Sequence, residues 1–167
     1  MKKFVLTTKG VLANEFEIKD LDNGVIYKGK KNMVSRFFIL LMRPWINPIN
    51  ITLEGSEGKN NLSIKYKGKN NNDIYENNIK IGELVGRKRI ATRYRFTISV
   101  NDKEYFFEGD TVSPIVKMYF NNHEIGLVQI KNQDFPHFDW ESTVSSDIDS
   151  RVIVLSLLYN YYIWGRV

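Results

Sequence analysis

The chain contains no cysteine among its 167 residues. This absence excludes disulfides, thiolate metal sites and a cysteine nucleophile, and it favours an intracellular protein. Histidine is also scarce, with only two residues. His137 has the carboxylates of Asp134 and Asp139 nearby, but three candidate ligands at irregular spacing in one loop are weak support for a metal site. We therefore predict no metal and no other cofactor.

Long hydrophobic runs are also lacking. The residues after Met1-Lys-Lys3 contain no apolar core of the length that a signal peptide needs. The apolar run Phe37–Met42 stops at Arg43-Pro44. It is too short to span a bilayer, so it predicts a buried strand. We expect a cytoplasmic protein, either dissolved or attached peripherally to a membrane.

The common catalytic motifs are absent as well. The run Gly55–Gly58 lacks the spacing of a hydrolase elbow and of a P-loop, and no dinucleotide-binding glycine motif follows a strand. Asp147 and Asp149 are best interpreted as charges at the start of a helix, where the helix dipole favours them. We therefore predict no catalytic residues and a protein that is not an enzyme.

What the chain does contain is typical of one folded domain. It is 43% hydrophobic and 13% aromatic, and no change in composition marks a linker, so we expect a single domain over residues 1–167. Turn signals recur at short intervals, and the segments between them alternate apolar and polar residues, as in Arg93–Val100. About ten short strands joined by tight turns predict an antiparallel barrel or sandwich.

The last segment is the only long helix signal, predicted over 149–164 with Asp149 or Ser150 as its cap. Its apolar residues point in every direction around the helix axis, so lipid or protein must surround it. About 15 residues are too few for a bilayer span. Ser156 and Asn160 also interrupt the apolar sequence, so a surrounding sheet is the better interpretation. A helix that detaches and inserts into a membrane is the alternative, but extraction of its large side chains would be very costly.

Two segments resemble each other, Asn77–Val85 and Asn121–Gln129, and Leu21–Gly29 is a weaker third copy. Each strong copy reads as a turn, a hydrophobic residue, a glycine inside a strand and further hydrophobic residues. A glycine inside a strand indicates a bulge or the close approach of another element.

With these repeats and its C-terminal helix at Arg151–Trp164, the chain resembles the tubby C-terminal superfamily. That superfamily includes the LURP-one-related proteins and is similar to the phospholipid scramblases. The resemblance implies a closed antiparallel barrel of twelve strands around a buried C-terminal helix. In its eukaryotic tubby branch it implies binding of phosphoinositide headgroups, but no binding residue of that branch matches a position here. The abundance of Asn, Lys and Ile suggests a small bacterial-type member, a group without an assigned activity.

The best candidate site is a basic strand. If residues 87–95 are extended, four arginines share one face and could bind phosphate bidentately: Arg87, Arg89, Arg93 and Arg95. Three lysines could extend this surface if their hairpin lies nearby: Lys28, Lys30 and Lys31. Ile90 and Tyr94 would then point into the core.

In an alternative interpretation, some of these arginines form ion pairs with carboxylates on the next strand. A hairpin turn at Asn101-Asp102 would place Arg95 opposite Glu108 and Arg93 opposite Asp110. The two arginines would then form ordinary cross-strand ion pairs, and only the first two arginines would stay unpaired.

The loop before the last strand offers another surface. Its aromatic residues Phe135, Phe138 and Trp140 are expected to pack onto the barrel end. If exposed instead, they would form a membrane-interface tip.

The net charge of +5 favours anionic partners. We therefore expect a monomeric binding module that recognises anionic phospholipid headgroups on a membrane surface. The alternative is a protein–protein interaction or scaffold domain. Nucleic acid is disfavoured because no established binding motif is present.

Overall fold

The computed structural model describes residues 1–9, 15–30, 51–56, 58, 60–68, 70–86, 93–110, 113–132, 139–145 and 147–164. The side chains of the final helix are described as far as Tyr161.

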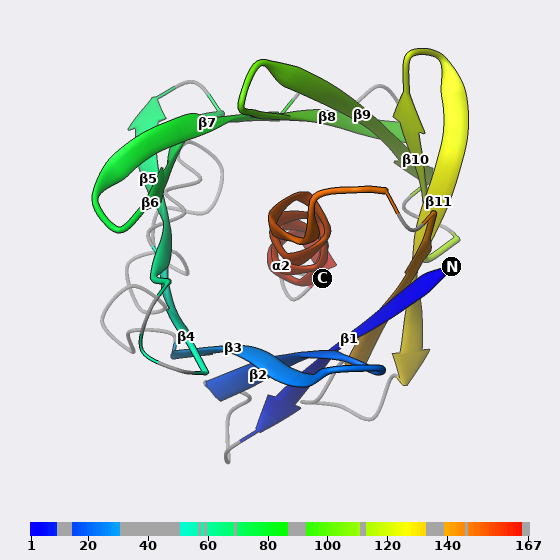
Figure 1. The fold of residues 1–167 in the computed structure, drawn as a ribbon. Coiled ribbons are helices and arrows are strands. Elements are labelled where there is room, and N and C mark those ends of the chain that lie inside the picture. Colours follow the sequence, from blue (N-terminus) through cyan, green and yellow to red (C-terminus); the bar gives the residue numbers. More distant parts are fainter. Residues whose placement is uncertain are drawn as a thin grey trace, which may run out of the picture.

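In this part of the chain, twelve antiparallel strands form a closed barrel around one helix (Figure 1). Each strand pairs with its sequence neighbours, and β1 pairs with β12 to close the barrel. The predicted fold class is confirmed, with two strands more than the turn signals alone indicated. The elements are β1 Lys2–Lys9, β2 Glu15–Asp20, β3 Gly24–Lys30, β4 Ile51–Gly55, β5 Leu62–Gly68, β6 Asn71–Glu76, β7 Ile79–Gly86, β8 Arg93–Val100, β9 Lys103–Asp110, β10 Ile115–Phe120, β11 His123–Asn132, β12 Asp139–Val144 and α2 Ser150–Trp164.

Because successive strands alternate in direction, the barrel has two different rims. The turns after β2, β6, β8 and β10 lie at the rim where α2 begins, which we call the turn rim. The strands β3 and β7 end at the opposite rim, where β8 begins, and we call this the far rim.

The helix α2 fills the barrel lumen, as predicted (Figure 1). It begins one residue after the predicted boundary, and Asp149 caps it: its Oδ1 accepts the Arg151 amide hydrogen at 2.9 Å and its carbonyl accepts that of Val152 at 3.0 Å. The side chains from Val152 to Leu158 are fully buried, whichever way they point around the helix. The strands therefore supply the apolar surroundings that such a helix requires.

Among the described residues, no helix combines the length and the apolar character needed to cross a bilayer.

The two polar residues of the helix are satisfied inside the barrel. The Ser156 hydroxyl donates to the Ile153 carbonyl at 2.8 Å, and the Asn160 amide donates to the Ser156 carbonyl at 2.8 Å. The Tyr94 hydroxyl on β8 donates to Asn160 Oδ1 at 2.9 Å. These bonds tie the helix to the wall at a depth where an unpaired polar group would be costly.

The sequence repeat corresponds to a structural one. The hairpins β2–β3, β6–β7 and β10–β11 each contain a bulge, at Ile26, Ile81 and Ile125 respectively. Each bulged carbonyl accepts a hydrogen bond from the first residue after the following strand: Ser56, Asn101 and Ser145. The barrel is thus built from three similar four-strand units, β1–β4, β5–β8 and β9–β12.

The predicted role of the strand glycines is confirmed and sharpened. Gly82 and Gly126 directly follow the bulges in β7 and β11, and they face Val100 and Val144 on the next strands. A Cβ at Gly82 would collide with the backbone carbonyl of Ser99. The close approach is therefore to the neighbouring strand, and not to the central helix.

Candidate functional site

The barrel lumen is filled by the protein's own side chains. Inward residues such as Phe16, Phe96, Phe107 and Trp140 are at most 1% exposed, and α2 occupies the axis. A hydrophobic ligand therefore has no room inside, unlike in an open-lumen barrel. Any recognition by this fold must use its outer surface or its two rims.

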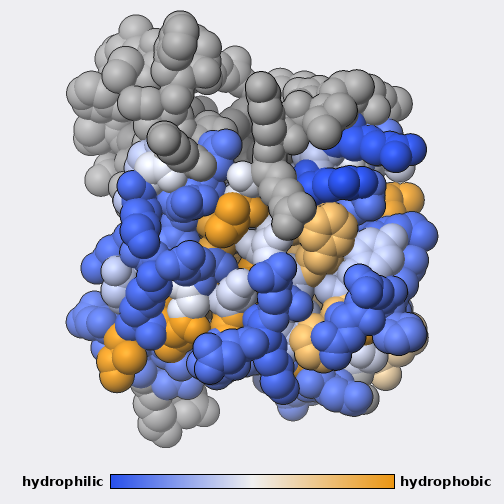
Figure 2. Space-filling model, turned by 90° about the horizontal axis from the view of Figure 1, so that it is seen from above, coloured by the Kyte–Doolittle hydropathy of each residue, from blue (hydrophilic) through white to orange (hydrophobic). Residues whose placement is uncertain are grey.

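The outer surface shown in Figure 2 is mostly hydrophilic, with hydrophobic side chains in small separate areas. The large hydrophobic side chains that are exposed among the described residues come from different elements: Met1, Leu21, Ile79 and Ile115. Charge and hydrogen bonding therefore dominate what this surface offers to a partner.

The strand β8 places its arginines as predicted. Its inward residues Tyr94, Phe96 and Ile98 are buried, while Arg93 and Arg95 alternate with them and are exposed on the outer face. The alternation follows from the two-residue period of a strand whose inner face packs against a helix.

The predicted register of the β8–β9 hairpin is also confirmed. Asn101 and Asp102 form its turn with positive φ of 50° and 62°, and Arg95 pairs with Glu108 while Arg93 pairs with Asp110. The Arg95 Nη2 atom lies 3.0 Å from Glu108 Oε1. The ordinary cross-strand ion pair is therefore present at Arg95.

Several predicted residues lie outside the described part of the chain. These residues are Arg87, Arg89, Ile90, Lys31, His137, Asp134, Phe135, Phe138 and the run Phe37–Met42.

The other two predicted lysines do not join the arginine surface. Lys28 and Lys30 are on β3, and four strands, β4–β7, lie between β3 and β8 around the barrel. The condition that their hairpin lies near the arginines is not met, because sequential pairing carries β3 and β8 toward different sides of the closed sheet.

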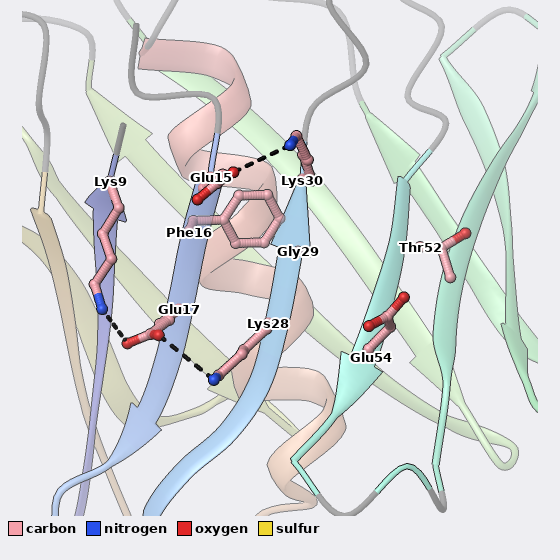
Figure 3. Close-up of a pocket in the computed structure, with 9 residues that line it drawn as sticks. All are labelled: Lys9, Glu15, Phe16, Glu17, Lys28, Gly29, Lys30, Thr52 and Glu54. Carbon is pink, nitrogen blue, oxygen red and sulfur yellow. Dashed lines mark hydrogen bonds and ion pairs between the residues drawn. The ribbon is translucent and has the colours of Figure 1, made fainter. Parts of the chain in front are cut away.

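Lys28 and Lys30 instead line a groove on the outer face of β2–β4 (Figure 3). We call it the lysine groove, and its volume is about 540 Å³. Its floor is Gly29, which leaves space that the ring of Phe16 fills from the inner side. Thr52 and Glu54 form the opposite wall.

The lysines of this groove are paired. Lys30 Nζ lies 3.1 Å from Glu15, and Lys28 Nζ lies 3.8 Å from Glu17. Glu17 also accepts a 2.7 Å hydrogen bond from Lys9. That bond lowers the pKa of the Glu17 carboxyl, against the smaller opposing effect of burial. The groove is therefore a mixed-charge surface and not a cationic one.

A third charged cluster lies where α2 begins and was not predicted. Arg151 reaches Glu76 at the end of β6 (Nη1 to Oε2, 2.7 Å) and Asp149 (Nη2 to Oδ2, 2.6 Å). Burial raises the pKa of Asp149, but hydrogen bonds from Arg151 outweigh it and leave the pKa below its usual 3.8. Only the helix signal around Arg151 could have hinted at this cluster, because its partner on β6 is far away in sequence.

Of the loop that carried the metal and membrane-tip alternatives, the structure describes Asp139 and Trp140. Asp139 Oδ1 accepts the backbone N–H of Thr8 at 3.2 Å, and Trp140 is fully buried. Trp140 therefore packs into the barrel, as the main interpretation expected, and cannot belong to an exposed aromatic tip. Over the described ranges, no group of three or more His, Cys, Asp or Glu side chains could hold a metal ion.

Comparisons with protein-family models, with curated proteins and with solved structures find no match to this chain.

Proposed function

We propose that this chain is a non-enzymatic binding module that recognises anionic phospholipid headgroups through the outward arginines of β8. The observation that carries the proposal is the exposure of Arg93 and Arg95 on a barrel whose lumen is closed to ligands. A guanidinium group matches phosphate because its planar fork donates two parallel hydrogen bonds.

The ion pair of Arg95 does not block this role. The side chains of Arg95 and Glu108 are 43% and 30% exposed, so water screens their attraction. Exposed pairs of this kind contribute about 0–1 kcal/mol. A lipid phosphate, whose negative charge is shared by two oxygens, can therefore replace the carboxylate at little cost.

The distribution of charge along the sequence favours the same class of ligand. Segments 31–50 and 87–92 contain six lysine or arginine residues and no acidic residue. Basic residues close to a membrane surface each contribute about 1 kcal/mol of attraction to anionic lipid.

Kinship with the tubby and LURP-one-related superfamily is part of this proposal. A closed barrel of twelve antiparallel strands around a C-terminal helix is the arrangement that the resemblance implied, and it supports the kinship. The protein would then act as a small bacterial-type member at the cytoplasmic surface of a membrane.

The test is co-sedimentation with phosphatidylcholine vesicles, prepared with and without phosphatidylserine. We expect the protein to bind only the anionic vesicles, and less at high salt because counterions screen the charges. The double variant Arg93→Ser/Arg95→Ser should bind about tenfold more weakly or worse. The matched control is Lys28→Ser/Lys30→Ser, which removes the same charge from the lysine groove and should bind nearly as well as wild type.

Equal loss in both variants would mean that net charge, and not the β8 surface, determines binding. Absence of binding by the wild type at low salt would reject the headgroup proposal. The scaffold alternative would then be favoured, because Leu21 and Ile79, which are 53% and 70% exposed at the turn rim, offer apolar contacts to a protein partner.

A further inference from the structure

A second concave site lies at the turn rim, away from the β8 arginines. It is a pocket of about 290 Å³ between the inner wall of β1–β4 and the first residue of α2. We call it the mouth pocket, and the lining residues that matter here are Phe4, Asp20, Asn23, Ile26, Tyr27 and Ser150.

The mouth pocket lies where the first four-strand unit departs from the repeat. In the second unit, Gly82 on the third strand faces Val100 on the fourth. In the first unit the large and the small residue exchange places: Tyr27 follows the bulge on the third strand and faces Gly55 on the fourth. The valine that fills this position elsewhere is thus missing, and a tyrosine hydroxyl has been introduced instead.

That tyrosine lines the pocket, and its hydroxyl oxygen is not among the fully buried side-chain atoms that lack a partner. Tyr27 is 7% exposed, and within the described part of the chain its oxygen forms no hydrogen bond. Burial raises the pKa of the phenol, and the nearby carboxylates of Glu76 and Asp149 raise it further, against the opposing charge of Arg151. The hydroxyl therefore stays protonated and neutral at physiological pH. Because its oxygen is open to the pocket and has no partner among the described side chains, it is available to accept a hydrogen bond from a bound group.

The charge of the pocket is negative. Asp20 is 7% exposed; its Oδ1 accepts the Asp22 N–H at 3.0 Å and its Oδ2 accepts the Asn23 amide at 2.7 Å. Each oxygen keeps a second lone pair, and across the described ranges no lysine or arginine forms an ion pair with Asp20. Near the helix start, Arg151 is already matched by two carboxylates, and Lys103 acts on Asp149.

These features favour a positively charged ligand over a negatively charged one. The start of a helix usually attracts an anion, but Asp149 already caps α2 and places a carboxylate there. An anion would face the Asp20 carboxylate, which lines the pocket. A cation with N–H groups would instead meet the Asp20 carboxylate, the Tyr27 oxygen and the Ser150 hydroxyl, all of which can accept hydrogen bonds. Phe4 and Ile26 add an apolar wall suited to a short alkyl chain.

We propose that the mouth pocket binds a small organic ammonium ion. Asp20 supplies the opposite charge, and Tyr27 and Ser150 accept the remaining N–H groups. The site lies at the turn rim and does not depend on lipid binding at β8, so either proposal can fail while the other stands.

The experiment is a titration of the full chain with n-butylammonium, followed by amide chemical shifts in NMR spectra. We expect saturable shifts at Asp20, Tyr27 and Ser150. The neutral analogue n-butanol and potassium chloride should not produce them. Asp20→Asn keeps the shape and removes the charge, and it should weaken binding by about tenfold or more.

Tyr27→Phe removes only the hydroxyl oxygen and should weaken binding by about threefold to tenfold. Its matched control is Tyr105→Phe, which alters another buried tyrosine that does not line the pocket, and which should bind like the wild type. Equal binding of n-butanol, unsaturable shifts spread over acidic side chains, or an unchanged affinity in Tyr27→Phe would each overturn the proposal. Because the phenylalanine keeps the ring, this test stands even if Asp20→Asn does not fold.

Discussion

At the scale of single residues, Arg151 joins the start of the central helix to the barrel wall. Its guanidinium binds Glu76 on β6 and Asp149 at the cap, and its side chain is only 20% exposed. Two carboxylates that would otherwise repel each other therefore share one cation. Because the cluster is partly shielded from water, its loss should cost more than the loss of a surface ion pair.

Replacing this residue, Arg151→Met, should lower the free energy of unfolding by about 2 kcal/mol, because it leaves two partly buried carboxylates without a cation. Urea denaturation at neutral pH measures the change. The matched control is Arg95→Met, which breaks an exposed pair and should cost no more than about 1 kcal/mol. Equal losses in the two variants would contradict the role given to the helix-start cluster.

Some residue positions could be predicted from the sequence and others could not. The pairing of Arg95 with Glu108 could be predicted because a two-residue turn determines which residues face each other across a hairpin. The wide separation of Lys28 from β8 could not, because it depends on how many strands lie between them around the closed barrel. The mouth pocket was also missed, although the position of Tyr27 in the weaker third copy of the repeat was its visible sign.

At the scale of elements, α2 is held by apolar packing all round, by the Arg151 cluster at its start and by the Tyr94–Asn160 hydrogen bond further along. An element with such contacts along its length should not open independently of the barrel. The alternative of a helix that detaches to insert into a membrane requires the opposite behaviour.

Native-state hydrogen exchange distinguishes these two cases. The amides of Leu155–Leu158 should exchange with the same free energy as the central amides of β8, because both would open only in global unfolding. A clearly lower free energy for the helix, with β8 still protected, would establish local release of α2 and revive the membrane-insertion alternative.

The bulged hairpins give a second prediction at this scale. Gly82→Ala should destabilise the protein by about 2 kcal/mol or more, because the new Cβ would meet the Ser99 carbonyl and force the strands apart. Gly24→Ala is the control: nothing lies within 4 Å of its Cβ position, and only its positive φ of 85° opposes the change. That strain should cost about 1 kcal/mol. Thermal unfolding of both variants measures the difference.

The elements themselves were largely readable from the sequence. Alternating residues on β8 and the apolar helix each have a period that specifies which faces are buried. The count of strands was less accessible, since turn signals alone indicated about ten. The bulges were readable only as glycines inside strands, because the clash that requires glycine involves the backbone of a neighbouring strand.

At the scale of the whole molecule, the ionised carboxylates make stability depend on pH. Arg151 holds the pKa of Asp149 below its usual 3.8, and lysines lower those of Glu17, Asp73 and Glu83. The unfolded chain therefore binds protons at a higher pH than the folded barrel does. The stabilisation is present above about pH 5 and is lost as the pH falls through the folded pKa values.

Urea denaturation at several pH values should show this loss of stability below about pH 5. Asp149, Glu17 and Asp73 should account for most of the effect, because their side chains are 27%, 16% and 16% exposed, whereas that of Glu83 is 45% exposed. In Arg151→Met, burial acts on Asp149 without the opposing cation, so the dependence on acid should become weaker. A variant with the same acid sensitivity as the wild type would assign the effect to the surface pairs instead.

The closure of the barrel has a consequence for synthesis on the ribosome. The strand β1 pairs with β12, and α2 follows β12 and fills the lumen. The barrel therefore cannot close, and its lumen cannot be filled, until the last part of the domain has been synthesised. Until α2 has emerged, the nascent chain holds apolar strand faces and unpaired strand edges that have no partner. Such surfaces are prone to aggregation. The native barrel should therefore form only after α2 has left the ribosome. Until then, chaperones that bind the exposed strands should reduce aggregation more than they do for domains built from local contacts.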